Sequence, residues 1–411
     1  MKKIELLAPA GDLEKLKTAV DYGADAVYFG GEMFSLRAGA GNLTVPEIRE
    51  GVEYARQRGC RCYLTVNIYA HNEDIGPLQM YLRELRGIPI DAFLVSDPGV
   101  MDVIREEFPS AELHLSTQAN MTNYRAAGFW HRMGVKRLVL ARELSLAEIR
   151  EISQKSPDGL ELEAFVHGAM CISYSGRCLL SSFMTGRDAN RGLCAHPCRY
   201  RYALTEEKRP GQYYPIEEDS RGTYILNSKD LCMIRHIPEL AESGVVSAKL
   251  EGRMKSAYYV ATVVHAYRQA IDAYYRDPEH YVFREEWFRE LCKVSHREFT
   301  TGFYFHEAAA EDQNYETSAY RKEYTFVGVV RRPAGDDGFA VVEQRNKMTR
   351  GERIEVFGPD IGFFCQEIGE MYDLESGEPL ESAPHPQQML RMRMEQPVKE
   401  GYMLRRKIEE P

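Results

Sequence analysis

The sequence predicts an α/β protein, a TIM-type (β/α)8 barrel followed by a small all-β domain of the β-barrel kind. Eight short apolar runs in the first two thirds of the chain alternate with segments whose apolar residues recur at helical spacing, as in a closed parallel barrel. An open doubly wound sheet is the alternative, but no GxGxxG fingerprint follows the first run. Towards the C-terminus, short alternating segments separated by Gly, Pro and Asp indicate the all-β domain.

The barrel strands are expected at the apolar runs, with amphipathic helices between them. The strands are predicted at residues 4–9, 25–30, 60–67, 91–97, 112–118, 135–142, 160–167 and 247–252. Clear helical periodicity occupies residues 12–23, 45–59 and 145–156, and a longer amphipathic segment at 257–276 is expected to close the barrel. A further helix is predicted near residues 285–294, and an irregular stretch follows it.

These elements divide the chain into three parts. The barrel is predicted at residues 1–280 with a cysteine-rich insertion at 168–245, a helical and irregular linker at 281–322, and the C-terminal β-barrel domain at 323–411. The insertion joins the seventh and eighth strands and is far longer than an ordinary connection in such a fold. Barrel enzymes carry their sites on loops after the carboxyl ends of the strands, so we expect the site beside this insertion.

Four cysteines lie close together in the insertion: Cys171, Cys178, Cys194 and Cys198, with six, fifteen and three residues between them. Thiolates at such spacing can converge on zinc or on an iron–sulfur cluster, and the residues alone do not choose between the two. Ordinary reduced thiols are the simpler alternative, because cysteine is often buried as a small apolar residue. Disulfides are less expected, since the opening MKKIELLAPAGD does not resemble a signal peptide.

Polar side chains follow several of the predicted strands. Each alone could merely satisfy the backbone of a loop, but the barrel would bring them together at its mouth. These residues are Asn67, Asp97, Thr117, Gln118, Arg142, Glu143, His167 and Glu251. A nucleophilic pair of Cys171 and His167 would suit a cysteine peptidase, but the spacing supplies no third residue to orient it.

The charge of the chain limits its partners. A net charge of -10 over 411 residues argues against a general nucleic-acid coat, because such binding neutralises many phosphates. Several cations lie near the cysteines and after the eighth strand, and they could form either a local basic groove or an ordinary solvated surface. They are Arg187, Arg191, Arg199, Arg201, Arg253 and Lys255. Since no apolar run approaches the about 20 residues that cross a bilayer, we expect a soluble, cytoplasmic protein without a membrane partner.

The cysteine motif and three other stretches resemble peptidase family U32, the collagenase-like peptidases. The matching stretches read EAFVHGAMCISYSGRCLLSSFMTGRDANRGLCAHPCRY, ELLAPAGDLEKLKTAVDYGADAVYFGG, NSKDLCMI and KLEGRMKS. The resemblance covers the whole chain and is greatest for the bacterial branch that hydroxylates the wobble uridine of certain transfer RNAs. Sister branches hydroxylate a ribosomal RNA cytidine or act in ubiquinone synthesis. Proteolysis, the historical label of the family, is the main alternative.

The resemblance implies an iron–sulfur cofactor and an anionic co-substrate. It implies a 4Fe-4S cluster on Cys171, Cys178, Cys194 and Cys198, with Cys232 as a reserve for the fourth ligand, and dependence on prephenate, a small dianion. The partners implied are the anticodon loop of a transfer RNA and a paralogue of the same family. The residues that we expect to carry the chemistry are Gln118, His167 and Glu251 as catalytic groups, and Arg142, Arg253, Lys255 and Tyr174 as substrate-binding groups, with Tyr174 stacking on the uridine.

Overall fold

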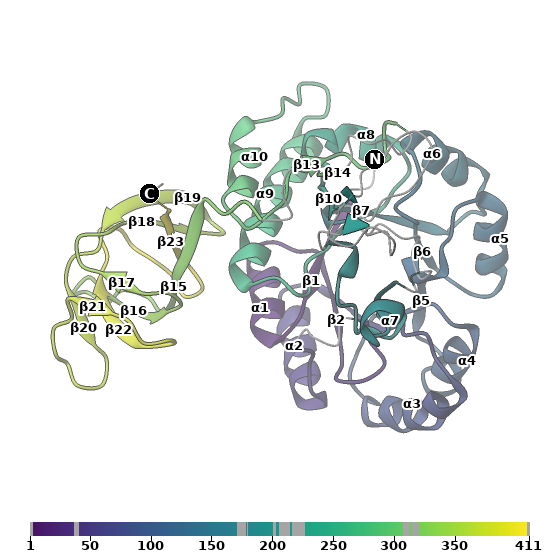
Figure 1. Cartoon of the computed structure of the whole chain (residues 1–411), viewed down its shortest axis with the longest axis horizontal. Coiled ribbons are helices and arrows are strands. Elements are labelled where there is room, and N and C mark those ends of the chain that lie inside the picture. The colour runs from purple at the N-terminus through teal and green to yellow at the C-terminus, as the bar shows by residue number, and fades with distance from the viewer. Residues whose placement is uncertain are drawn as a thin grey trace.

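The protein is described by a computed structural model of the chain (Figure 1). It describes residues 3–36, 41–170, 178, 180–199, 203–204, 214–215, 227–306, 313–314 and 320–408. A barrel with helices around it carries the N-terminal and central parts of the chain, and the yellow-green C-terminal strands form a separate body beside it. Cys171, Tyr174 and Arg201 lie outside the described residues.

Eight parallel strands form the barrel, and each predicted run overlaps one of them; β1 and β7 extend one and two residues past their runs. The ring closes because β12 pairs with both β1 and β7, which rules out the open-sheet alternative. The predicted TIM-type barrel is therefore confirmed. In ring order the strands are β1 (Glu5–Ala10), β2 (Ala26–Gly30), β3 (Arg61–Val66), β4 (Ala92–Val95), β5 (Glu112–Leu115), β6 (Arg137–Val139), β7 (Glu161–Ala169) and β12 (Ser247–Leu250).

Helices surround this ring, as the periodicity predicts (Figure 1). Local capping explains where several of them begin: the Asp12 carboxylate accepts a hydrogen bond from the Lys15 backbone N–H at 2.9 Å, and Thr44 with Glu47 forms a capping box. The helices are α1 (Leu13–Asp21), α2 (Val45–Gln57), α3 (Asn72–Glu84), α4 (Pro98–Glu107), α5 (Tyr124–Arg132), α6 (Leu146–Lys155), α8 (Ile237–Glu242), α9 (Ala257–Arg276) and α10 (Glu285–Cys292), and a single 3-10 turn, η1 (Thr117–Ala119), follows β5.

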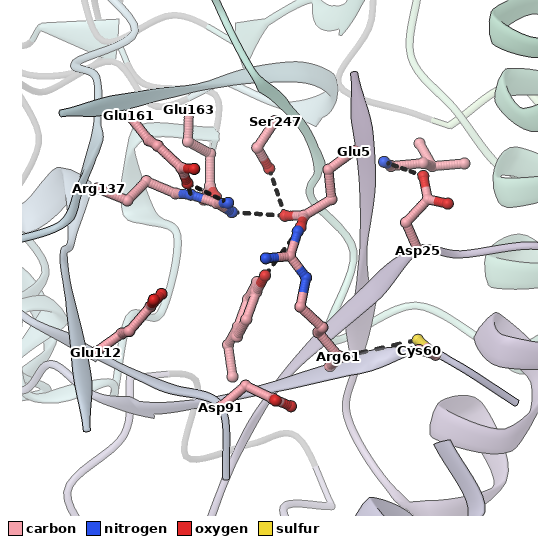
Figure 2. Close-up of polar contacts among 12 residues, drawn as sticks. Glu5, Asp25, Cys60, Arg61, Asp91, Glu112, Arg137, Glu161, Glu163 and Ser247 are labelled. Atoms are coloured by element: carbon pink, nitrogen blue, oxygen red, sulfur yellow. Dashed lines mark hydrogen bonds and ion pairs between the residues drawn. The ribbon is translucent and has the colours of Figure 1, made fainter. Parts of the chain in front are cut away.

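A charged cluster lies inside the barrel, near the amino ends of the strands. Figure 2 shows the guanidinium of Arg137 lying among the carboxylates of Glu5, Glu161 and Glu163. Its nitrogens are 2.5, 2.7 and 3.2 Å from those three carboxylates, in that order, and Arg137 is only 1% exposed. The ammonium of Lys249, on β12, lies 2.7 Å from Glu163. Because each of these charges has a close opposite charge, their burial is compensated.

The insertion between β7 and β12 is described in part. Its elements are α7 (Leu180–Thr185), η2 (Ala189–Arg191), η3 (Pro197–Arg199), β8 (Ala203–Leu204), β9 (Tyr214–Pro215), β10 (Asn227–Ser228), β11 (Asp230–Cys232) and η4 (Ile234–His236). Arg191 fastens the insertion to the barrel, because its two terminal nitrogens donate to Asp74 at the start of α3 at 3.0 and 3.1 Å. This bidentate contact answers one of the open questions about basic residues near the cysteines: Arg191 is anchored to a carboxylate.

The segment predicted as a linker packs closely on the barrel. Trp287 and Leu291 of α10 belong to the barrel's own apolar core. The short strand β13 (Phe299–Thr300) pairs with β11, which in turn lies antiparallel to β7, and β14 (Gln313–Asn314) pairs with β10. Strands of two residues are too short to show an alternating pattern in the sequence. Their partner strands lie more than sixty residues away, so the pairing has no local signal either.

The C-terminal part is an antiparallel all-β domain, as predicted. Seven strands form one sheet in the order β19-β18-β23-β15-β16-β22-β20, and β17 with β21 forms a second small sheet. These strands enclose an apolar core separate from that of the barrel. They are β15 (Tyr324–Arg332), β16 (Phe339–Gln344), β17 (Met348–Thr349), β18 (Arg353–Gly358), β19 (Ile361–Glu367), β20 (Met371–Asp373), β21 (Ser382–Ala383), β22 (Met389–Arg393) and β23 (Met403–Lys407).

The two bodies meet through stacked rings and buried ion pairs. The rings of Tyr258, on α9, and Phe326, on β15, stack with their centroids 5.4 Å apart. Arg405, which is 0% exposed, lies 2.8 Å from Glu290 on α10 and 2.7 Å from Glu355 on β18. A barrel-side carboxylate thus shares one guanidinium with the β-domain, which fixes how the domains dock. Within the part of the chain that the structure describes, no helix is long and apolar enough to span a membrane.

Candidate active site

A cavity of about 220 Å³ opens at the carboxyl ends of the barrel strands. Residues of seven barrel strands or of the turns just after them, from β2 to β7 and β12, line it together with the insertion, as the barrel prediction requires. It brings together most of the candidates named from the sequence: Gln118, Arg142, Glu251, Arg253, Lys255, Cys178, Cys194 and Cys198. Asn67 and Thr117, which follow β3 and β5, also line it. The convergence on which the sequence-based prediction rested is therefore present in the fold.

One wall of the cavity carries a paired arginine and glutamate. Arg142 follows β6 and Glu251 follows β12, and an Nη2–Oε2 distance of 3.7 Å separates them. The Arg142 guanidinium also lies over the ring of Phe165, 4.0 Å from its centroid. The ring and the carboxylate hold the guanidinium in place while it still faces the cavity, which is how a fixed carboxylate receptor is built.

The floor of the cavity is formed by Lys249, which the sequence-based selection missed. Its ammonium is buried, pairs with Glu163, and lies over the ring of Tyr28 at 4.2 Å. A signal for it existed, because alternate residues of a barrel strand face the interior. Ser247 and Glu251, two residues away on either side, both face inward, so Lys249 had to do the same. A lysine on a barrel strand joins the cavity to the charged cluster beneath it.

Arg253 lines the cavity and also supports its wall. Its Nη1 donates to Ser35 Oγ at 2.8 Å and to Thr65 Oγ1 at 3.3 Å, and its Nη2 donates to Asn42 Oδ1 at 2.6 Å. A Cβ at Gly30 would lie 2.2 Å from that Nη2, so the close approach of the guanidinium requires a glycine there. Arg253 therefore ties the ends of β2 and β3 and the loop between β2 and α2 to the turn after β12.

His167 is not brought into the cavity, although it was selected as a catalytic group. The pairing of β12 with β7 shifts register between Lys249 and Leu250, so that His167 pairs with the outward-facing Leu250. A one-residue shift sends a side chain to the opposite face of a sheet. The His167 ring is buried with the rings of Tyr259, Tyr267 and Phe299 around it. Burial lowers the pKa of this imidazole to about 3, and the charges of His296 and Lys255 add to that effect.

We expect His167 to make the fold sensitive to acid. Its pKa lies well below the ordinary value of a histidine, so the unfolded chain binds a proton that the folded protein excludes, and stability falls as the pH drops below about 6.5. Between pH 7 and pH 4 the protonation of His167 should lower the free energy of unfolding by on the order of 3 kcal/mol. Urea denaturation of His167→Phe should show a shallower loss over that range. The variant should still lose some stability at low pH, because His114 is also buried and its pKa is also lowered. An identical pH dependence in the variant would contradict this prediction.

Three of the four clustered cysteines lie at the mouth. Cys178, Cys194 and Cys198 line the cavity and are half-buried, whereas Cys171 is outside the described residues. The His196 backbone N–H donates to Cys194 Sγ at 3.4 Å, the kind of hydrogen bond that stabilises a sulfur ligand. The chemistry of this donor set fits a thiolate-bound cluster. Within the described ranges, no group of three His, Cys, Asp or Glu side chains is placed to hold a metal ion.

Cys232, the reserve ligand, lies elsewhere. It is on β11, 7% exposed, and does not line the cavity. Burial raises the pKa of its thiol to about 12, which disfavours the thiolate that a metal needs. This placement favours Cys198 over Cys232 as the fourth sulfur. His196, between the last two cysteines, lines the cavity and was missed in the sequence, where a lone histidine in a loop gives no signal.

Comparisons with known proteins match the chain along almost its whole length. Residues 11–314 match the model of peptidase family U32, and residues 322–405 match the family's C-terminal domain. The chain is 44% identical over 407 residues to the tRNA hydroxylation protein P1 of Bacillus subtilis (98% of this chain, 95% of the relative). It is 38% identical to the tRNA hydroxylation protein P of Escherichia coli (87% of each chain) and 33% identical to a protein named collagenase from Porphyromonas gingivalis (91% of each chain).

Proposed function

Because the chain belongs to peptidase family U32, we propose that it hydroxylates the wobble uridine of transfer RNA at carbon 5, with prephenate as co-substrate and an iron–sulfur cluster as cofactor. One observation carries the proposal: a relative named for tRNA hydroxylation is 44% identical across 98% of the chain. The site supports it, because a cationic, cysteine-lined cavity at a barrel mouth suits an anionic co-substrate and a metal cluster. We propose a cytoplasmic location with it, because transfer RNA is the proposed substrate.

The cofactor that we propose is a 4Fe-4S cluster held by Cys171, Cys178, Cys194 and Cys198. When bound, such a cluster supplies a redox-active and Lewis-acidic centre. The insertion holds its three described cysteines close to the cavity through contacts of its own: Asn190 Nδ2 donates to the Cys178 carbonyl at 2.8 Å, and Ser181 Oγ accepts from the Ala195 N–H at 3.0 Å. These hydrogen bonds position the sulfur ligands beside the substrate cavity.

The residues of the cavity account for binding of a dianion. Arg142 presents a fork suited to a carboxylate and is oriented by Glu251 and Phe165. Lys255 adds a cation on the outer side, where its Nζ donates to the Ser295 carbonyl at 3.2 Å. Lys249 at the floor contributes positive charge, although Glu163 balances it. Gln118, after β5, supplies an amide that can donate to a substrate oxygen.

Replacing Arg142 by Ala should weaken binding of prephenate. Loss of a charge-assisted hydrogen bond typically costs about 1.5–3 kcal/mol, or roughly ten- to a hundredfold in affinity. Isothermal titration with the cluster-loaded protein measures this directly, and Arg142→Lys should recover only part of the affinity because an ammonium cannot form the bidentate contact. The matched control is Arg83→Ala on the outer surface of α3, where the side chain is half-exposed and far from the cavity lining. Equal affinity in Arg142→Ala and Arg83→Ala would remove Arg142 from the co-substrate site.

The function is tested in cells that lack this gene and any paralogue of the same family. Mass spectrometry of digested nucleosides should show that 5-hydroxyuridine and its derivatives disappear from transfer RNA, and the wild-type gene should restore them. If transfer RNA is unchanged and a ribosomal RNA cytidine loses a hydroxyl group, the protein acts on ribosomal RNA, as a sister branch of the family does. If neither RNA changes in these cells, proteolysis becomes the favoured function instead.

Proteolysis is the second candidate, because a relative 33% identical is named a collagenase. A Cys171 and His167 pair was the one arrangement that the sequence offered for it. The structure buries His167 on the outer face of β7 with a pKa near 3, away from the cavity lining, so the pair lacks an accessible base. Hydrolysis of gelatin that co-purifies with the protein and disappears in Cys171→Ala would favour this alternative.

A further inference from the structure

Large apolar side chains are exposed around the mouth of the cavity. Met254 and Tyr320 line the cavity and yet are 50% and 41% exposed, and Tyr69 is 62% exposed. Tyr69 adjoins the lining residue Asn190, because its backbone N–H donates to the Asn190 carbonyl at 3.0 Å. Other exposed apolar side chains on segments that follow the strand ends are Met33, Met184 and Leu193. Exposed apolar side chains that gather around a cavity indicate a binding surface.

Contacts hold the ring of Tyr320 and the backbone of Tyr69 in this rim. Two cations contact the ring of Tyr320: Lys255 Nζ is 4.1 Å and Arg297 Cζ 4.4 Å from its centroid, while 41% of the residue stays exposed. Arg297 is itself fixed, since its backbone N–H donates to Asp230 at 3.0 Å. The backbone of Tyr69 is fastened by Arg191 Nη1, which donates to its carbonyl at 3.2 Å. Rings held in place before a ligand arrives lose little entropy on binding.

The charge of the mouth complements a polyanion. The cations that line the cavity are Arg142, Lys249, Arg253 and Lys255, and among its described lining residues Glu251 is the one acidic side chain. Glu251 pairs with Arg142, and Glu163 pairs with Lys249 beneath the cavity, so Arg253 and Lys255 carry the excess. This excess of positive charge occurs in a chain whose net charge is -10. Cations combined with exposed aromatic rings are the usual surface for single-stranded nucleic acid, where each base has a face that can stack. A duplex keeps its bases stacked on one another and could not use these rings.

We propose that Tyr69 and Tyr320 are stacking platforms for the bases that flank the target nucleotide in a single-stranded RNA loop. The inference rests on the proposed function, and it names residues that recognise the RNA rather than residues that carry out the chemistry. Stacking of the neighbouring bases on the rim splays the loop, so that the target base can enter the cavity while its phosphates lie near Lys255. Met254 adds an apolar contact beside Tyr320 on the same rim.

The platform is tested by RNA binding. Fluorescence anisotropy measures the affinity of the cluster-loaded protein for an unmodified anticodon stem–loop. Tyr69→Ala and Tyr320→Ala should each bind about five- to a hundredfold more weakly, and Tyr69→Phe and Tyr320→Phe should bind like wild type because stacking needs only the ring. The matched control is Phe129→Ala, an aromatic residue on the outer helix α5 that is 49% exposed, and it should not change binding. The iron content and visible spectrum must match wild type in every variant.

A second RNA separates stacking from a general loss of binding. In this RNA, one nucleotide next to the target uridine is abasic, so that it keeps its phosphate and loses its ring. Wild type should bind it more weakly than the intact loop, whereas at least one of Tyr69→Ala and Tyr320→Ala should bind both RNAs alike. Wild-type affinity in both Ala variants, or equal weakening in the Phe variants, would overturn the stacking platforms while the proposed function stands. If wild type itself does not bind the loop, the proposed function fails, and the platforms fail with it.

Discussion

Purified without oxygen, Cys178→Ala, Cys194→Ala and Cys198→Ala are each expected to lose the broad visible absorption that the proposed cluster would give the wild-type protein. Cys171→Ala should behave in the same way. Each of these sulfurs would be one ligand of four, and a cluster that lacks one thiolate loses iron or converts to another form. The three described cysteines lie half-buried at one cavity mouth, and the sulfur of Cys194 accepts a hydrogen bond from a backbone N–H. A cluster would have to lie at this mouth to act on a substrate in the cavity.

The matched control for these variants is Cys232→Ala. Cys232 is buried on β11, away from the cavity lining, and burial raises the pKa of its thiol to about 12. This variant should keep the colour, the iron and the sulfide of wild type. If Cys232→Ala bleaches the protein and Cys198→Ala does not, Cys232 is the fourth ligand. Stoichiometric zinc without iron in the anaerobic wild type would replace the cluster by a zinc site.

Arg137→Ala is expected to destabilise the fold more than any surface change. The substitution removes the buried cation that Glu5, Glu161 and Glu163 share. Among the described residues, Glu163 then keeps only its ion pair with Lys249, and Glu5 only its ion pair with Arg61. Breaking a buried ion pair from one side typically costs about 3–5 kcal/mol. The midpoint of urea unfolding should fall accordingly, and Arg137→Lys should recover only part of the loss, because an ammonium cannot bridge several carboxylates in the same way.

The pH dependence identifies the cause of this loss. Burial alone would raise the pKa of Glu163, but the charges of Lys249 and Arg137 hold it at about 2 in the folded protein. The stability that this carboxylate contributes is therefore present above its ordinary pKa of about 4.5 and is lost as the pH falls towards 2. The difference between wild type and Arg137→Ala should narrow over that range. The control is Lys155→Ala, at an exposed pair with Glu151, which should unfold like wild type. A constant difference from pH 7 to pH 3 would mean that lost packing, not lost charge, explains the effect.

The strands and helices could be predicted because their signals are local. Buried parallel strands are short continuous apolar runs, and all eight runs overlap a barrel strand. The starts of helices are marked by N-cap residues whose side chains accept hydrogen bonds from the first turn, such as Asp12 before α1 and Ser145 before α6. The C-terminal domain was visible for the same reason, since turns and alternation are read within a few residues. The location of the site followed from one rule of the fold, that loops after the carboxyl ends of barrel strands carry it.

Other features depend on residues that are distant in the chain. His167 seemed a site residue because it ends a strand, but a register shift against β12 turns it to the outer face, and no pattern in β7 alone reports that shift. Arg253 was selected as a ligand for an anion, and its contacts with Ser35, Asn42 and Thr65 became visible only when three strand ends met. The packing of α10 and β13 on the barrel was hidden for the same reason.

The sequence by itself determined which residues form the barrel and its β-domain, that cysteines and cations gather after its strands, and which family the chain resembles. These follow from period, capping and motif spacing, which are properties of neighbouring residues. The tertiary structure decided which candidates share a cavity, that Lys249 forms its floor, and that Tyr69 and Tyr320 stand at its rim. A cavity is made where side chains from many strands converge, and the closed register of the sheet, not the local pattern, sets the direction in which each of them points.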